Sequence, residues 1–356
     1  MEKVKLGDIA VLINGDRGKN YPSQADITEE GDVPFVNAGH LTGRTIDFGD
    51  MNYISKEKYE KLNSGKFEKG DILYCLRGSL GKKAIVNDDV VGAIASSLVI
   101  IRPDYEKIDG EYLMFSLDSP SIKEQLVKAN NGSSQPNLSA ASVREYQIEL
   151  PDISLQKEVV EKLTRVRNVM DERQKELNLL NELIKARFVE MFGDPIANTK
   201  GLEVRSLKDV MVLKAGDFTA ASDISEEPNE VNMYPCYGGN GIRGYVAEYN
   251  QEGNYSLIGR QGALSGNVQY ATGKFKNTEH ALLVTPTIKM NSIWLNQLLI
   301  NLDLKRYQTG AAQPGLSVKN LQEIQIIIVP IDEQNKYAEF VRQVDKSKVV
   351  ELNAVA

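Results

Sequence analysis

Residues 152–192 limit what this 356-residue chain can fold into more than any other stretch does. Apolar residues recur there at alternating intervals of roughly three and four positions, which is the a/d pattern of a heptad helix. Pro151 precedes the pattern, and Gly193 and Pro195 follow it, as at helix boundaries. At 1.5 Å per residue the helix would be about 60 Å long. The seam residues expected to contact another helix are Leu163, Val166, Met170, Leu177, Leu180 and Ile184.

A heptad pattern by itself fits either a coiled-coil helix or a long amphipathic core helix. The flanking sequence distinguishes the two. The flanks are two copies of one sequence. Residues 5–16 resemble residues 206–217, and residues 131–139 resemble residues 309–317. Between these segments, residues 72–86 resemble residues 256–270, and we match Arg77 with Arg260. A repeat of this length indicates a duplicated domain, because solenoid repeats are far shorter.

Each copy is followed by a proline and then by a helical pattern that carries a glutamine, Gln156 or Gln334. The order is therefore domain, helix, domain, helix. We predict a first domain at 1–151, a central helix at 152–199, a second domain at 200–330 and a short distal helix at 331–356. The distal helix presents Tyr337, Val341 and Val344 on one seam, which we expect to pair with the central helix as an antiparallel coiled coil.

Within the domains, short apolar runs bounded by turn residues predict strands, and only a few segments are helical, so we predict an α+β fold with mainly-β domains. In the first domain the expected strands are 33–36, 72–76, 84–86, 98–101 and 146–150, and the expected helix is 111–129. In the second domain we expect a late helix at 294–307 and a strand at 326–329.

Composition excludes several classes of protein. No run reaches the roughly 18 apolar residues of a membrane span, and the N-terminus does not lead into an apolar signal segment. Cys75 and Cys236 are far apart and lack CxxC spacing, so we interpret them as reduced thiols of a cytoplasmic protein. With only two further candidates, His40 and His280, a zinc site is not expected.

Catalytic motifs are also missing. The chain has no GxxxxGK[ST] phosphate loop and no Pro-Pro dipeptide, so it lacks the Asn/Asp-Pro-Pro-aromatic motif of amino-methyltransferases. Neither Pro-Asp pair is followed at workable spacing by the Glu/Asp-x-Lys of a common magnesium nuclease. A serine or cysteine nucleophile would need a histidine partner, which the spacing does not suggest. We therefore expect no catalytic residue, no metal and no cofactor in this chain.

The repeats instead present polar loop residues suited to DNA. Arginine can fork onto guanine, Gln and Asn onto adenine, while Ser, Thr and Lys hold phosphates. An exposed arginine beside glycine is often only a solvated loop residue, and a Gln-Pro turn can be structural, but both features recur in the two copies. The candidates are Lys19, Tyr21, Arg77, Ser79, Lys82, Gln135 and Asn137 in the first copy, and Asn240, Arg243, Arg260, Gln261, Lys274 and Gln313 in the second.

The net charge of −7 and the pI near 5.2 argue against a free-standing, non-specific DNA-binding protein. They suit a protein with a local basic groove, or one that works in a complex whose other subunits hold the DNA backbone.

Over its whole chain the sequence resembles the specificity (S) subunit of type I restriction-modification systems. The features that carry the resemblance are the two copies of Gln-Pro-x-Leu-Ser, each followed by a proline and a heptad helix. Residues 183–195, LIKARFVEMFGDP, look like the segment that closes the central helix in such subunits. Residues 237–245, YGGNGIRGY, look like a common opening of a target recognition domain.

The resemblance implies a non-catalytic reader of double-stranded DNA, with each domain reading one half of a split site. The helices would set the separation and dock the modification subunits, two of them in the complex. Those partners would carry S-adenosylmethionine and methylate adenine, and a restriction subunit would add ATP and magnesium. The distal helix departs from the family pattern, because it is much shorter than the central one.

A different hypothesis is a coiled-coil scaffold or adaptor whose duplicated domains bind a protein or another ligand, which the acidic pI favours. A self-contained restriction enzyme is disfavoured by the missing motifs. Enrichment of a bipartite sequence from a random DNA pool would separate the specificity subunit from the scaffold.

Overall fold

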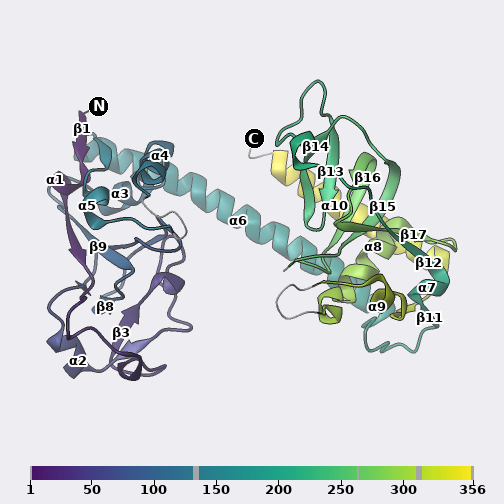
Figure 1. Ribbon diagram of the computed structural model, residues 1–356, viewed down its shortest axis with the longest axis horizontal. Coiled ribbons are helices and arrows are strands. Elements are labelled where there is room, and N and C mark those ends of the chain that lie inside the picture. The colour runs from purple at the N-terminus through teal and green to yellow at the C-terminus, as the bar shows by residue number, and fades with distance from the viewer. Residues whose placement is uncertain (1, 131–135, 263, 310–314, 354–356) are drawn as a thin grey trace. The chain divides into compact units, whose positions relative to one another are not determined.

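The computed structural model describes residues 2–130, 136–262, 264–309 and 315–353, with backbone only for 349–353 (Figure 1). The chain divides into two compact units, Met1–Val169 and Met170–Ala356, called here the first unit and the second unit. The longest helix, α6 (Ile153–Phe192), contributes its beginning to the first unit and its end to the second.

The first unit is built on two four-stranded sheets. One has the order β2-β9-β6-β7 and the other the order β4-β3-β8-β5, while β1 pairs antiparallel with β10. The strands are β1 (Glu2–Lys5), β2 (Ala10–Asn14), β3 (Val33–Val36), β4 (Tyr53–Ile54), β5 (Lys66–Phe67), β6 (Ile72–Cys75), β7 (Lys83–Ile85), β8 (Gly92–Ile94), β9 (Leu98–Pro103) and β10 (Gln147–Leu150). The helices are α1 (Leu6–Ile9), α2 (Lys56–Lys61), α3 (Gly110–Ser116), α4 (Pro120–Ala129) and α5 (Ala140–Arg144), with 3₁₀ turns η1 (Gln24–Asp26) and η2 (Ala38–His40).

The second unit has one six-stranded sheet of order β12-β17-β15-β16-β13-β14, and β11 pairs antiparallel with β18. The strands are β11 (Val204–Ser206), β12 (Met211–Ala215), β13 (Tyr234–Gly238), β14 (Gly241–Val246), β15 (Gln251–Gly259), β16 (Val268–Asn277), β17 (Ala281–Pro286) and β18 (Gln325–Ile327). The helices are α7 (Leu207–Val210), α8 (Ser292–Asn301), α9 (Val318–Gln322) and α10 (Ile331–Asn353), with 3₁₀ turns η3 (Ala221–Asp223) and η4 (Leu304–Tyr307).

The two units share several strand pairings, which confirms the predicted duplication, although the first has two four-stranded sheets and the second has one six-stranded sheet. The outer pair β1–β10 corresponds to β11–β18, and the pair β2–β9 corresponds to β12–β17, antiparallel in every case. In each unit a parallel pairing joins the strand before the polar turn to a later strand, β3 to β8 and β13 to β16. The equivalent residues Gly15 and Gly216 both press against backbone: a Cβ would lie 3.0 Å from the Ala95 oxygen in one and 2.0 Å from the Asn277 oxygen in the other.

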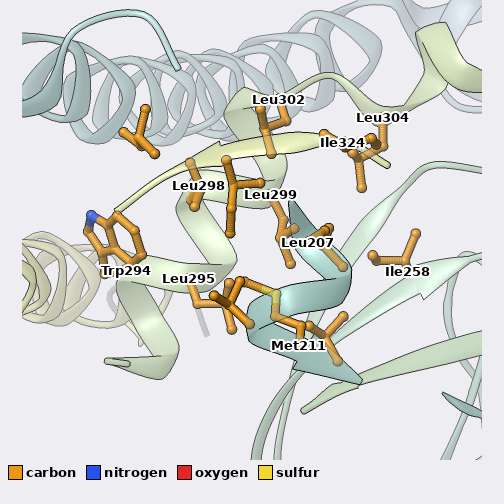
Figure 2. Packing of buried hydrophobic residues seen from close by; sticks show 14 of the residues in the cluster. Leu207, Met211, Ile258, Trp294, Leu295, Leu298, Leu299, Leu302, Leu304 and Ile324 are labelled. Carbon is orange, nitrogen blue, oxygen red and sulfur yellow. The ribbon is translucent and has the colours of Figure 1, made fainter. Parts of the chain in front are cut away.

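A leucine-rich core packs α8 onto the sheet of the second unit. Figure 2 shows Trp294, Leu295, Leu298, Leu299 and Leu302 of this region against Leu207, Met211 and Ile258. The same cluster contains Ile184, Phe188 and Phe192 of α6 and Tyr337, Val341 and Val344 of α10. The first unit has its own clusters, one of which covers the opposite side of the β6–β9 sheet from the other.

The two long helices meet within the second unit and run antiparallel. The Tyr337 ring lies 5.4 Å from that of Phe188 and 5.6 Å from that of Phe192. The Tyr337 hydroxyl donates to the Ile184 carbonyl oxygen at 3.0 Å, and Phe340, one turn later in α10, lies beneath the Arg187 guanidinium. Of the predicted seam, Ile184, Tyr337, Val341 and Val344 are buried, Leu177 and Leu180 are half-buried, and Leu163, Val166 and Met170 are exposed.

Two predicted helices are interrupted. The helix expected at 111–129 is α3 followed by α4, because Ser119 caps a new helix whose first residue is Pro120. A proline cannot continue the preceding helix but suits the first position of the next. The helix expected at 294–307 ends at Asn301, and Asp303 adopts a left-handed conformation before η4. The two cysteines are free and buried.

Candidate nucleic-acid interface

The loop that follows β6 in the first unit has the same backbone frame as the loop that follows β15 in the second. We call residues 76–82 and 260–267 the strand-end loops; Ala263 lies outside the described residues. The Cys75 amide donates to the Lys82 oxygen at 2.8 Å, and the Gly259 amide donates to the Asn267 oxygen at 2.9 Å. Gly78 and Gly262 both have positive φ, 79° and 81°, which glycine adopts without strain.

The described part of the Gln-Pro loop lies beside the strand-end loop in both units. This loop is the repeated segment 131–139 and 309–317, of which residues 136–139, 309 and 315–317 are described. The Leu138 amide donates to the Leu76 oxygen at 2.8 Å, and the Leu316 amide donates to the Arg260 oxygen at 2.8 Å. Segments about 60 residues apart in sequence thus lie side by side in each unit. We call the strand-end loop and the described part of the Gln-Pro loop together the polar edge of the unit.

This hydrogen bonding corrects the sequence alignment by one residue. Leu316 bonds to Arg260 as Leu138 bonds to Leu76, so Arg260 is the equivalent of Leu76 rather than of Arg77. The residue equivalent to Arg77 is Gln261, and the bridges Arg77–Asn137 and Gln261–Gly315 agree. Leu76 is buried and Arg260 only half-buried, whereas Arg77 and Gln261 are exposed.

Arg260 has local partners that explain its partial burial. Its Nη1 donates to the Glu279 carbonyl oxygen at 3.4 Å. The exposed Gln261 is oriented by His280, whose Nδ1 lies 3.1 Å from the Gln261 Oε1. The exposed residue at this position is therefore an arginine in the first unit and a glutamine in the second.

A side chain from the end of each strand-end loop ties it to a third loop. In the first unit Lys82 Nζ donates to the Ala38 oxygen at 3.1 Å, in the turn after β3. In the second unit the equivalent residue, Asn267, donates from Nδ2 to the Asn240 Oδ1 at 2.6 Å, in the turn after β13. These bonds hold three loops together before any ligand binds, which reduces the ordering cost of recognition.

The remaining predicted residues are spread more widely, and Lys274 lies opposite Glu252, at the far end of the β15–β16 pair from the strand-end loop. Ser79, Asn137 and Lys19 are exposed, whereas Tyr21 is half-buried and its hydroxyl accepts from the Ser96 amide at 3.3 Å. Arg243 and Lys274 are exposed, and Lys274 Nζ lies 4.7 Å from the centre of the Tyr249 ring. Gln135 and Gln313 lie outside the described residues.

Sequence reasoning missed three residues at or beside the polar edge: Arg17, Asn267 and His280. Arg17 donates from Nη2 to the Ser96 oxygen at 3.4 Å. Its equivalent in the second unit is Phe218, which is exposed. If the two segments are aligned on Gly81 and Gly266 instead of on the arginines, Asn267 falls at the position equivalent to Lys82.

The exposed side chains of these loops offer hydrogen-bond donors and acceptors: a guanidinium at Arg77 and carboxamides at Asn137 and Gln261. Burial raises the pKa of both the Cys75 and the Cys236 thiol, which suits inert side chains and not nucleophiles. In the part of the chain that the structure describes, no three His, Cys, Asp or Glu side chains gather as a metal site would require. No helix among those residues is long and apolar enough to cross a membrane.

Comparisons with known proteins agree with this organisation. The family model of the type I restriction modification DNA specificity domain matches residues 1–182 and again residues 199–354. A curated relative, the type I restriction enzyme EcoprrI specificity subunit of Escherichia coli, is 29% identical over 322 residues, covering 85% of this chain and 78% of that protein.

Two solved structures share the fold. A crystal structure of the S subunit of a type I restriction-modification system from M. genitalium aligns with a TM-score of 0.57 and 18% identity, covering 99% of this chain and 91% of that one. A chain from a structural study of complex assembly and conformational transition of the type I R-M system aligns with a TM-score of 0.51 and 19% identity, covering 99% and 93%. The duplicated units, the long helices and the two matches of the family model together show that this chain belongs to the family of type I restriction-modification DNA specificity subunits.

Proposed function

We propose that this chain is the non-catalytic DNA reader of a type I restriction-modification complex, in which each unit reads one half of a bipartite site. The observation that carries the proposal is the repeated polar edge: in both units a strand-end loop and a Gln-Pro loop lie side by side, joined through Arg77–Asn137 and Gln261–Gly315. Family membership disfavours the scaffold hypothesis, which gives no reason for this repetition.

The exposed side chains suit base recognition. A guanidinium such as that of Arg77 can donate two parallel hydrogen bonds to the O6 and N7 of guanine, and a carboxamide such as that of Gln261 can pair with the N6 and N7 of adenine. Lys19 and Lys274 are exposed cations that can hold phosphates, and Lys274 does so at the far end of the β15–β16 pair from the strand-end loop. Because the equivalent positions carry different residues, the two half-sites would differ in sequence.

Helix α6 would separate the two readers and dock the modification subunits. Val166 is 56% exposed and Met170 is 57% exposed, although both belong to the heptad seam. Leu163 belongs to the same exposed part. An apolar seam left uncovered on a helix is a suitable surface for partner helices. We infer two modification subunits carrying S-adenosylmethionine, with ATP and magnesium confined to the restriction subunit, in a cytoplasmic complex.

The decisive experiment is to co-express this chain with its cognate modification subunit and map methylated adenines across the genome. We expect one motif made of two specific half-sites separated by a fixed gap. Methylation without a bipartite motif, or a random DNA pool that enriches no such sequence with the complex, would return the scaffold hypothesis to first place.

A change in helix length tests the spacer role. Removing residues 164–170 shortens α6 by one heptad, about 10 Å at 1.5 Å per residue, so the gap should shrink by roughly three base pairs while the half-sites stay the same. A matched control replaces the same seven positions with a different helix-forming heptad of equal length, and should keep the gap. A gap that survives the deletion unchanged contradicts the spacer role.

A further inference from the structure

A buried glutamine occupies the fourth position of each long helix. Helix α6 begins at Ile153 and α10 begins at Ile331, and Gln156 and Gln334 are 0% and 2% exposed. Neighbouring polar residues in both first turns are exposed or half-buried. A glutamine is rarely buried completely unless its carboxamide is hydrogen-bonded. Because both glutamines are buried at the same helix position, we expect them to make similar hydrogen bonds.

The two amides make matching hydrogen bonds. Gln156 Oε1 accepts from the Asp109 amide at 2.8 Å, and its Nε2 donates to the Lys107 oxygen at 3.0 Å and to the Pro151 oxygen at 2.9 Å. Gln334 Oε1 accepts from the Asn291 amide at 2.8 Å, and its Nε2 donates to the Val329 oxygen at 2.9 Å. Pro151 and Val329 hold the same place before the two helices.

The acceptor atom of each glutamine binds the residue that caps another helix. Asp109 is the N-cap of α3, where its side chain accepts from the Tyr112 amide, and Asn291 is the N-cap of α8. Both α3 and α8 pack into the core of their own unit through residues such as Leu113 and Trp294. One carboxamide therefore joins the end of the last strand segment, the start of a core helix and the first turn of the long helix.

Only a carboxamide can make this set of bonds from one side chain. Glutamate has no donor at neutral pH, lysine has no acceptor, and methionine has neither in comparable strength. Because the amide is buried, rotating the first helical turn would break several hydrogen bonds in a region of low dielectric constant. Together with the apolar packing of Val159 on α6 and of Tyr337 on α10, these bonds hold the first turn of each long helix in one orientation on its unit.

We propose that Gln156 and Gln334 are positioning residues that set the direction in which each long helix leaves its unit, and so determine which half-site spacing the complex accepts. This inference rests on the proposed reading of two half-sites. The side chains themselves are buried and touch no DNA; they act through the helices.

The test uses the full chain assembled with its modification subunits and a panel of DNA duplexes in which the gap between the mapped half-sites is the native length or differs by one or two base pairs. Binding to each duplex gives a spacing preference, the ratio of dissociation constants for native and altered gaps. A second panel with single base changes in one half-site measures sequence preference separately.

We expect Gln156→Met and Gln334→Met each to reduce the spacing preference by roughly fivefold, in line with the loss of a buried hydrogen-bonded group, with half-site sequence preference unchanged. The matched control is Gln174→Met on α6, an exposed glutamine that bonds only to Asn178 in the next turn; it should leave both preferences intact. If Gln156→Met does not assemble, Gln334→Met, which loses one accepted and one donated bond, tests the same role from the second unit, and the same reduction is expected.

Variants that melt at lower temperature but keep the spacing preference of the wild-type complex would overturn the positioning role and leave only a structural one. A wild-type complex that tolerates every gap equally would instead refute the proposed function itself, before any variant is compared.

Discussion

Phe188→Ala should destabilise the second unit far more than a change on the same heptad seam nearer the start of α6. Phe188 is 0% exposed, and its ring lies 5.1 Å from Phe192, 5.4 Å from Tyr337 and 6.5 Å from Trp294. Truncating a buried phenylalanine to alanine costs about 3–5 kcal/mol, from lost apolar transfer energy and from the cavity left behind.

The size of the unit converts this loss into a melting shift. For a domain of 150–250 residues, 1 kcal/mol corresponds to about 2–4 °C, so the transition of the second unit should fall by roughly 6–20 °C. Differential scanning calorimetry of the full chain resolves the two units if they unfold separately, and near-ultraviolet circular dichroism reports the Trp294 environment. The first unit has its own core and should keep its transition.

The matched control is Val166→Ala, because Val166 belongs to the same seam but is 56% exposed. Substitutions at such surface positions usually change stability by no more than about 0.5 kcal/mol. Equal losses in the two variants would mean that Val166 is covered in the isolated chain, and the description of a half-covered seam would be wrong. Equal shifts of both calorimetric transitions would contradict the independence of the two cores.

Three further outcomes follow from the structure. Arg77→Ala should reduce base discrimination in one half-site only, and Gln261→Ala in the other, each by about 1–3 kcal/mol. Genome-wide methylation maps of the two variants test this, and loss of discrimination in the same half-site for both would contradict it. The Ser23 hydroxyl and amide, together with Lys58, lower the pKa of Asp26 to about 2. Its carboxylate therefore stabilises the fold fully above the unfolded pKa of about 3.9, and this effect is lost as the pH falls through 2. The difference in urea midpoint between wild type and Asp26→Asn should be full at neutral pH and shrink steadily between about pH 4 and pH 2; a difference that stays constant over that range would count against it. Gly216→Ala places a Cβ within 2.0 Å of a backbone oxygen and should destabilise by about 1–3 kcal/mol, more than an alanine at its counterpart in the first unit; chemical denaturation of both variants measures the order.

The duplication, the α+β class and the long helix follow from the sequence because each leaves a strong periodic or repeated signal. Leu6 and Leu207, or Pro151 and Pro330, recur with their surroundings, and the heptad spacing persists over the whole of α6. Helix boundaries leave a weaker sequence signal. The break between α3 and α4 depends on Ser119 and Pro120, which lie inside an otherwise helical pattern.

The alignment of the strand-end loops shows where sequence comparison fails. Matching Arg77 to Arg260 pairs two arginines, but hydrogen bonding to Leu138 and Leu316 places Gln261 at the position of Arg77. In that register Leu73, Gly78 and Leu80 match Leu257, Gly262 and Leu264, so matching a single prominent residue was a poorer guide than matching the whole segment. The sequence also could not show which part of the heptad seam is buried. Leu163 and Val166 are exposed, although their spacing is the same as that of buried seam positions.

The antiparallel contact of α6 with α10 has a consequence for how the protein came to read DNA. These helices are counterparts in the duplication, and two identical helices packed antiparallel are what a twofold axis produces. A single-copy ancestor pairing in this way would be an isologous homodimer, limited to palindromic targets because both halves would be identical. Joining the copies in one reading frame removes that limit, because each copy can then change independently, as Arg17 and Phe218 have at equivalent positions.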